Sequence, residues 1–327
     1  IAPAASTYFR IFALGLPIMV LNYVSAGMLQ CSGDMKVPSL LNVCMCFLNV
    51  LFNALLIFPS GTFRLPFLGL PLPGAGLSVA GAALGTVLAR LVVTVLLLYF
   101  LLLRSEILHL RRGERAPVSR QELIAAARIS VPQGFESAIT GSAYVAFTAI
   151  VAPLGTAAIA ANSFAITAES LCYMPGYGIG TAATTLIGQS YGANRRDMTK
   201  NLSWLLTVLT MVVMTGSGVL MYVFAPWMIG LLSPDASVRS LGTQVLRIEA
   251  FAEPLYGASI AINGVFRGMG DTLTSSVLNL ISMWAVRIPL AAFLSKSYGL
   301  PGVWRAMCIE LCVRGLLFIF RLWRKKL

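Results

Sequence analysis

The fold class is decided by residues 201–234, whose sequence is NLSWLLTVLTMVVMTGSGVLMYVFAPWMIGLLSP. This stretch contains no Asp, Glu, Lys or Arg, and a helix needs about 20 mostly apolar residues to cross the hydrocarbon core of a bilayer. It therefore predicts a transmembrane helix. Further stretches that lack these four residue types lie at 11–33, 37–63, 65–89, 137–168 and 170–194.

The composition of the whole chain agrees with a membrane protein. Of the 327 residues, 57% are hydrophobic and only 11% are charged, which leaves too little polar surface to cover a soluble globule of this size. We predict an all-α membrane protein with about nine transmembrane helices. They are expected at 8–31, 36–58, 75–103, 121–152, 157–190, 201–224, 237–266, 272–294 and 300–322.

The basic residues predict how the chain is oriented in the membrane. Lys and Arg number 24 against 12 Asp and Glu, which gives a net charge of +12. No basic stripe lies on an otherwise solvated face, so nucleic acid is excluded as a partner. If the basic segment at 104–130 is cytoplasmic, most of the other Lys and Arg in connections fall on the same side. The C-terminus is then cytoplasmic, and a multi-pass protein of a bacterial inner membrane is expected.

The chain repeats itself at a distance of 237 residues. Identical residues then pair at Arg10/Arg247, Ile11/Ile248, Ala13/Ala250, Pro17/Pro254, Gly27/Gly264, Gly33/Gly270, Asp34/Asp271, Ser39/Ser276, Leu41/Leu278 and Asn42/Asn279. Such self-similarity predicts two copies of one unit, as many transporters have. The second copy follows three helices that have no counterpart before residue 1, so we expect three helices to precede this sequence.

The repeat predicts a 6+6 arrangement of two lobes. Residues 1–104 are expected to form part of the N-terminal lobe, residues 105–120 a cytoplasmic connector, and residues 121–327 the C-terminal lobe. In transporters built from such repeats, the substrate site lies between the halves.

Several motifs in the same order resemble the multidrug and toxic compound extrusion (MATE) family of the larger superfamily of flippases and exporters. They are YFRI at 8–11 with GLP at 15–17, GDMKVP at 33–38, GAALGT at 81–86, GQSYGA at 188–193 and RGMGDT at 267–272. The resemblance covers nearly the whole chain. It implies a twelve-helix antiporter that exports amphipathic or cationic small molecules in exchange for Na⁺ or H⁺, with this chain holding the family's helices 4–12. We expect a monomer in the lipid bilayer, without a cofactor.

Acidic residues inside the predicted helices are the candidates for the coupling cation. Glu169 and Glu253 fall near mid-membrane, and Glu136 lies in the cytoplasmic half of its helix. An ionisable residue at such a depth is costly, so a function is the default hypothesis. The alternative is that each acid neutralises a buried Arg. We expect a structural role for Glu249, one turn before Glu253.

The resemblance gives partial help with these acids. Many members of the family carry a functional Glu about two turns after the Pro of their seventh helix. Here Glu136 follows Pro132 by four positions and Thr140 occupies the later place. Glu136 is therefore a displaced candidate.

Polar side chains and prolines complete the predicted site. The candidate partners of a cation or substrate are Gln133, Thr140, Asn162, Tyr256 and Asn263. The candidates for a cleft lining or a hinge are Pro17, Asn22, Asn42, Pro175 and Pro254. The asparagines can equally form hydrogen bonds between helices, and the Gly-rich segment around Pro175 can serve close helix packing.

Other chemistries are less well supported. The six cysteines have no His partners at metal-binding spacing and no Walker A loop is present, so Na⁺ is the only metal ion expected and ATP is not used directly. A membrane-embedded transferase would place its catalytic groups near one interface. A lipid-linked oligosaccharide flippase of the same superfamily would need a cationic cleft, in which Arg90, Arg287, Arg305 and Arg314 face the cavity. We expect instead that Arg287 pairs with Glu310, which lies at a similar depth.

Overall fold

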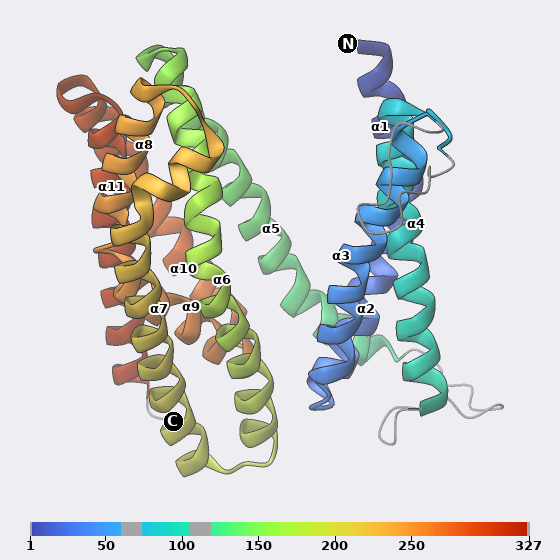
Figure 1. Cartoon of the computed structure of the whole chain (residues 1–327). Coiled ribbons are helices and arrows are strands. Elements are labelled where there is room, and N and C mark those ends of the chain that lie inside the picture. The colour runs from blue at the N-terminus through green and yellow to red at the C-terminus, as the bar shows by residue number, and fades with distance from the viewer. Residues whose placement is uncertain (1, 60–73, 105–118, 326–327) are drawn as a thin grey trace. The chain divides into compact units, whose positions relative to one another are not determined.

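The computed structural model describes residues 2–59, 74–104 and 119–325, and these residues form helices without any named strand (Figure 1). The chain divides into two compact units, Ile1–Ala116 and Pro117–Leu327. The connector expected at 105–120 lies almost wholly outside the described residues.

The N-terminal unit is a small bundle of helices. Its elements are α1 (Ala2–Leu14), α2 (Leu16–Cys31), α3 (Lys36–Ile57), α4 (Ser78–Tyr99) and the π-helical turn η1 (Phe100–Arg104). α4 packs against each of the other three helices. The bundle buries an apolar core around Leu29, Leu41, Val93 and Leu97.

The C-terminal unit is larger and is organised around one short helix. Its elements are α5 (Arg120–Val151), η2 (Ala152–Leu154), α6 (Thr156–Gly192), α7 (Arg196–Leu232), α8 (Ala236–Glu249), α9 (Glu253–Gly268), α10 (Thr272–Ile281), η3 (Ser282–Arg287) and α11 (Ile288–Arg324). α9 packs against α6, α7 and α11 (Figure 1). The largest side chains of the core, Trp304, Phe266 and Phe318, are fully buried here.

Two helices that we expected to be continuous are broken. The predicted helix at 8–31 divides into α1 and α2, whose axes differ by 46°, and the one at 237–266 divides into α8 and α9. Pro17 and Pro254 therefore stand in the first turn of a new helix and not in the middle of a long one. Proline favours an interruption there, because it has no N–H to donate and its ring clashes with the carbonyl four residues earlier.

The backbone reproduces the 237-residue repeat in detail. α2 and α9 begin and end at positions one repeat apart, and Gly33 and Gly270 both have positive φ, at 97° and 76°. The same turn follows each helix, since Asp34 N donates to Leu29 O at 3.0 Å and Asp271 N donates to Phe266 O at 2.9 Å. Each Asp side chain then caps the next helix. A shared turn of this kind supports descent of both segments from one unit.

Asp271 has an additional partner in the second copy. Lys325 Nζ donates to its Oδ2 at 2.7 Å, which fastens the end of α11 to the α9–α10 turn. Burial works to raise the pKa of Asp271, but the hydrogen bonds from Lys325 and Thr274 and the Lys325 charge outweigh burial and hold the pKa below its usual range.

Asp271→Asn is expected to lower the free energy of unfolding by about 1 kcal/mol at neutral pH. Because the folded-state pKa is depressed, the ionised Asp271 contributes stability above its unfolded pKa of about 3.9, and this contribution is lost as the pH falls through the folded value. Thermal unfolding in detergent at several pH values measures the difference. An unchanged gap between the two proteins from pH 7 down to the acid limit would contradict the assignment.

The segment labelled α11 contains a sharp reversal of chain direction. Gly299 has φ 61° and ψ −141°, outside the helical region. A Cβ on Gly302 would lie 2.3 Å from the carbonyl oxygen of Leu294, whereas eight residues of straight helix would separate these positions by about 12 Å. The chain therefore folds back at Gly299, between the helices predicted at 272–294 and 300–322.

The predicted number of nine spans is not confirmed. By length and apolar composition, the described residues contain five helices able to cross a membrane, or six if the bent pair α1–α2 counts as one span. This count takes Thr272–Arg324 as a single helix, although the chain folds back at Gly299 within it. α6 and the α8–α9 pair are not among the five. α6 is rich in Ala, Gly, Ser and Thr, and α8–α9 is broken beside Glu249 and Glu253. The small residues of α6 allow close helix packing, and the break between α8 and α9 lies at two buried acidic residues.

Glycines bring α6 and α9 into backbone contact. A Cβ on Gly264 would lie 2.3 Å from the carbonyl oxygen of Gly180, and one on Gly180 would lie 3.0 Å from the Ile260 side chain. Gly176 meets Met214 of α7 in the same way, at 2.7 Å. The Gly-rich segment of α6 therefore serves close packing, the interpretation that competed with a hinge at Pro175.

Gly264→Ala is expected to destabilise the C-terminal unit by about 1–3 kcal/mol, because the added methyl group has no room against a backbone carbonyl. Gly178→Ala on α6 is the matched control, since a Cβ there meets nothing within 4 Å. Thermal unfolding of both variants in the same detergent tests the contact. Equal midpoints for the two variants would show that α6 and α9 are not in backbone contact.

Candidate cation-binding site

Four carboxylates are buried together in the C-terminal unit, each from a different helix. Glu169 of α6, Glu249 of α8, Glu253 of α9 and Glu310 of α11 are 7%, 1%, 1% and 0% exposed. Glu249 lies within electrostatic reach of the other three and of Arg287. We call these four residues the acid cluster. Burial of this many carboxylates is tolerated only when their charge is compensated.

Arginines compensate one member of the cluster. Glu310 Oε1 lies 2.6 Å from Nη2 of Arg314, and its Oε2 lies 3.6 Å from Nε of Arg287. Ser282 also donates a hydrogen bond to Glu310. Ser282 and Arg287 are the first and last residues of the π-helical segment η3. The predicted pair of Arg287 with Glu310 is confirmed, and Arg314 is an additional partner that the sequence pattern did not reveal.

The rest of the cluster is short of positive charge. Neither carboxylate oxygen of Glu253 has a hydrogen-bond partner within the described part of the chain, and Oε2 of Glu249 has none either. Four carboxylates stand against two guanidinium groups, which leaves two formal negative charges uncompensated. Since an isolated ionised carboxylate in an apolar interior is strongly disfavoured, these groups must take up protons or hold a cation.

The break between α8 and α9 places Glu253. The residue opens α9, and Gly218 lets the backbone of α7 approach it, because a Cβ on Gly218 would lie 3.0 Å from Cβ of Glu253. Glu249, expected to be structural, ends α8 on the other side of the same break. Both acids therefore lie where the helix is interrupted.

Glu136 lies in a different environment, in which both of its carboxylate oxygens accept hydrogen bonds. Ser276 Oγ donates to it at 2.6 Å, Asn279 Nδ2 at 2.7 Å and Gln133 Nε2 at 3.2 Å. Gln133, a candidate polar partner of the cation or substrate, thus contacts Glu136, and Ser276 and Asn279 of α10 are further partners. Both belong to the repeated positions Ser39/Ser276 and Asn42/Asn279, so the repeat carried the signal that could have identified them.

The other predicted polar residues differ in their surroundings. Asn162 accepts a hydrogen bond from Trp304 Nε1 at 3.0 Å and is buried. The Oδ1 atom of Asn263 is buried without a hydrogen-bond partner among the described residues. Thr140 is half-buried on α5, one turn after Glu136. Tyr256 lies with its hydroxyl oxygen 3.4 Å from that of Tyr177.

The predicted cleft and hinge residues have varied surroundings. Asn22 is buried and donates to Thr94 Oγ1 at 3.2 Å, the contact between helices that was the alternative to a cleft lining. Asn42 is exposed on α3. Pro175 lies inside α6, which continues through it.

The geometry restricts how a metal ion could be held. Among the residues that the structure describes, no three His, Cys, Asp or Glu side chains converge closely enough to form a metal site. A Na⁺ ion in the acid cluster would therefore take most of its ligands from carbonyl, hydroxyl and amide oxygens, as hard cations can.

Comparison with known proteins identifies the family. The sequence profile of the MatE family matches residues 1–55 and 132–293. The chain belongs to the MatE family. The resemblance inferred from its motifs is thereby confirmed, and the apolar helices agree with a multi-pass membrane protein.

Two bacterial relatives match nearly the whole chain at low identity. The probable multidrug resistance protein NorM of Thermotoga maritima is 27% identical over 337 residues, which cover 100% of this chain and 69% of the relative. The probable multidrug resistance protein YoeA of Bacillus subtilis is 25% identical and matches 98% of this chain and 69% of its own length.

Solved structures share the fold. An outward-facing multidrug resistance MATE transporter of the MOP superfamily superposes with a TM-score of 0.86 at 21% identity, over 97% of this chain and 69% of that one. A MOP superfamily transporter of Pyrococcus furiosus, for which a reversed polarity of the binding pocket suggests a different function, gives a TM-score of 0.85 at 21% identity over 97% and 68%.

Proposed function

We propose that this MatE protein is a secondary active exporter that moves amphipathic or cationic small molecules out of the cell in exchange for Na⁺ or H⁺. The observation that carries the proposal is the uncompensated charge of the acid cluster, above all the unpartnered oxygens of Glu253 in the described part of the chain. The multidrug resistance relatives support the class of substrate.

Exchange follows from the electrostatics of the cluster. A bound Na⁺ or proton neutralises Glu253 and its neighbours and removes the cost of their burial. A second conformation in which these groups meet water releases that cation. If a cationic substrate favours the conformation that the cation disfavours, the two ligands drive each other across the membrane through alternating access.

Aromatic side chains beside the cluster are suited to hold a flat cation. Tyr173 packs edge-on against both Tyr177 and Tyr256, with ring centroids 5.5 and 6.0 Å apart, and lies within electrostatic reach of Glu169 and Glu253. A cation over such a ring gains about 1 kcal/mol. We propose these tyrosines as part of the substrate wall, with Asn162, Asn263 and Thr140 as further polar partners. Glu136 and Glu169 are proposed as coupling acids beside Glu253.

The remaining expectations belong to the same proposal. They are a monomer that needs no cofactor, a C-terminus in the cytoplasm, and rocking of two lobes about the breaks at Pro17 and Pro254. The flippase alternative is not favoured, because two of the four arginines that it requires in a cationic cleft, Arg287 and Arg314, are bound to Glu310.

Ion-driven export is tested with the protein reconstituted in vesicles. Tetraphenylphosphonium, an amphipathic cation, is loaded inside, and a Na⁺ gradient or a pH gradient is imposed separately. We expect one gradient to accelerate release of the probe. If neither gradient moves this or any other amphipathic cation, the proposal is wrong.

A further inference from the structure

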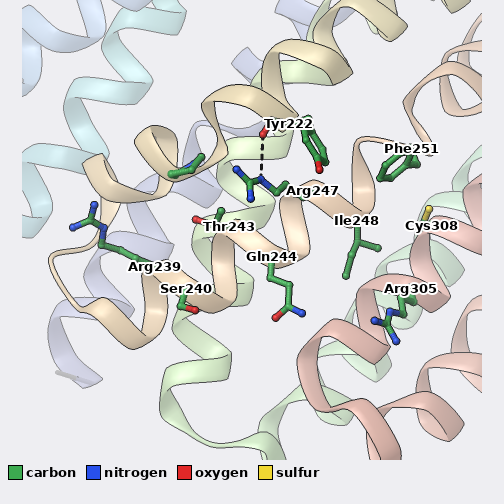
Figure 2. A pocket seen from close by; sticks show the side chains of 11 residues that line it. Tyr222, Arg239, Ser240, Thr243, Gln244, Arg247, Ile248, Phe251, Arg305 and Cys308 are labelled. Carbon is green, nitrogen blue, oxygen red and sulfur yellow. Dashed lines mark hydrogen bonds between the residues drawn. The ribbon is translucent and has the colours of Figure 1, made fainter.

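A hollow lies at the end of the C-terminal unit where α7 ends and α8 begins, opposite the turn that holds Asp271. It consists of a pocket of about 680 Å³ between α7, α8 and α11 (Figure 2) and an adjoining pocket of about 440 Å³ at the Gly299 reversal. The two pockets share Gln244 and Arg305. The hollow is separate from the acid cluster, since none of the four carboxylates lines it.

The lining of this hollow is cationic. Arg239, Arg247 and Arg305 line the larger pocket, and no Asp or Glu lines either one. None of the three arginines forms an ion pair in the parts of the chain that the structure describes. All three side chains are exposed, so their guanidinium groups are open to a negatively charged partner from outside the chain.

Two of these arginines are held so that their guanidinium groups stay available. Arg247 donates from Nε to the carbonyl oxygen of Tyr222 at 3.4 Å and lies over the Tyr222 ring at 5.2 Å. Arg305 lies over the Tyr298 ring at 4.9 Å. Stacking fixes the planes of both groups without neutralising their charge, and the terminal N–H groups are left to bind an anion.

The neighbouring side chains add both hydrogen-bond donors and apolar surface. Ser240, Thr243 and Gln244 supply hydroxyl and amide groups from α8, as Figure 2 shows, and Pro226, Ile248 and Phe251 are apolar. A cationic substrate would be repelled here. An anion that carries several acceptor oxygens and an apolar portion fits both kinds of lining side chain.

We propose that this hollow binds the phosphate group of an anionic amphiphile, with Arg247 and Arg305 on the phosphate oxygens. A phospholipid headgroup and a soluble phosphate share this chemistry. The apolar side chains favour the lipid, because its acyl chains could continue along Pro226 and Phe251. This site would act whether or not the acid cluster couples transport.

The test is binding to the purified protein in detergent, followed as the shift of the thermal unfolding midpoint. The probes are dioctanoyl phosphatidylglycerol, dioctanoyl phosphatidylcholine and inorganic phosphate, each titrated separately. We expect a saturable upward shift with the anionic lipid and a much smaller one with the zwitterionic lipid. A shift with inorganic phosphate at similar concentrations supports the phosphate site and assigns it to a soluble ligand.

Variants locate the effect. Arg247→Gln and Arg305→Gln are each expected to weaken binding about tenfold, as the loss of a charge-assisted contact does. Arg128→Gln, an exposed arginine on α5 outside the hollow, is the matched control. Thr243→Glu keeps every arginine but adds a carboxylate, which repels an anion, so it should also weaken binding. This variant tests the site if an arginine variant does not fold.

The proposal is overturned if both lipids shift the midpoint equally, or if the shift survives in Arg247→Gln, Arg305→Gln and Thr243→Glu alike. Because the readout is binding, a failure of ion-driven export leaves it unaffected, and the two proposals can fail separately.

Discussion

Glu310→Gln is expected to destabilise the C-terminal unit by about 3–5 kcal/mol, since it removes the only carboxylate paired with two arginines in the described structure, the buried Arg287 and the half-buried Arg314. Arg287 and Arg314 would then lose the negative charge that both now face, because glutamine offers only a neutral acceptor oxygen. Thermal unfolding in detergent measures the loss, which is expected to appear as a lower midpoint and a lower yield of folded protein.

Two further variants separate pairing from ordinary surface effects. Glu122→Gln is the matched control, because Glu122 lies on the exposed first turn of α5 and glutamine can keep its capping contact with Ser119. The double variant Glu310→Gln/Arg314→Gln should be less destabilised than the sum of its two single variants, since it leaves fewer unpaired charges. Additive losses would contradict the pairing.

Glu253→Gln is expected to abolish coupling, with ion-driven export reduced by about 10- to 100-fold while the substrate still binds. The substitution keeps the shape of the side chain but cannot release a proton or bring a full negative charge to a cation. Export under a Na⁺ or pH gradient is compared with binding of tetraphenylphosphonium to the same preparation. Glu122→Gln again serves as the control.

Two of the three candidate acids, Glu136 and Glu253, can be ranked by the same assay. Glu136 has three hydrogen-bond donors around it, whereas both oxygens of Glu253 lack one in the described residues. Glu136→Gln is therefore expected to have the smaller effect on coupling. Normal ion-driven export by the Glu253→Gln variant would remove that residue from the mechanism.

The repeat and the all-α class could be predicted from the sequence because both follow from local residue types. Runs without charged residues predict helices in a bilayer. The turns at Gly33–Asp34 and Gly270–Asp271 can be recognised in the sequence as a repeated motif, although the sequence does not give their backbone geometry. The breaks at Pro17 and Pro254 were expected only as bends. Whether a proline bends a helix or starts a new one depends on neighbours that pack against the interruption, as Gly218 does at Glu253.

The partners of the acids could be predicted only in part. Arg287 and Glu310 were predicted to pair because they lie at similar depths in the membrane. The depth of a residue follows from its distance in sequence from the end of its helix. Arg314 reaches the same carboxylate from one turn along α11, and its contact depends on which face of α11 points inward. Glu249 was expected to be structural, yet it shares the uncompensated charge of the cluster because α8 and α9 meet there.

The central claim is that the acid cluster of the C-terminal unit exchanges a cation for the substrate. The most direct measurement is the number of Na⁺ ions or protons released when tetraphenylphosphonium is added to the purified protein, followed with ion-selective and pH electrodes. Release of one of these cations in proportion to probe binding, and its loss in Glu253→Gln, is the predicted result. Saturable binding of the probe with release of neither ion would contradict the claim.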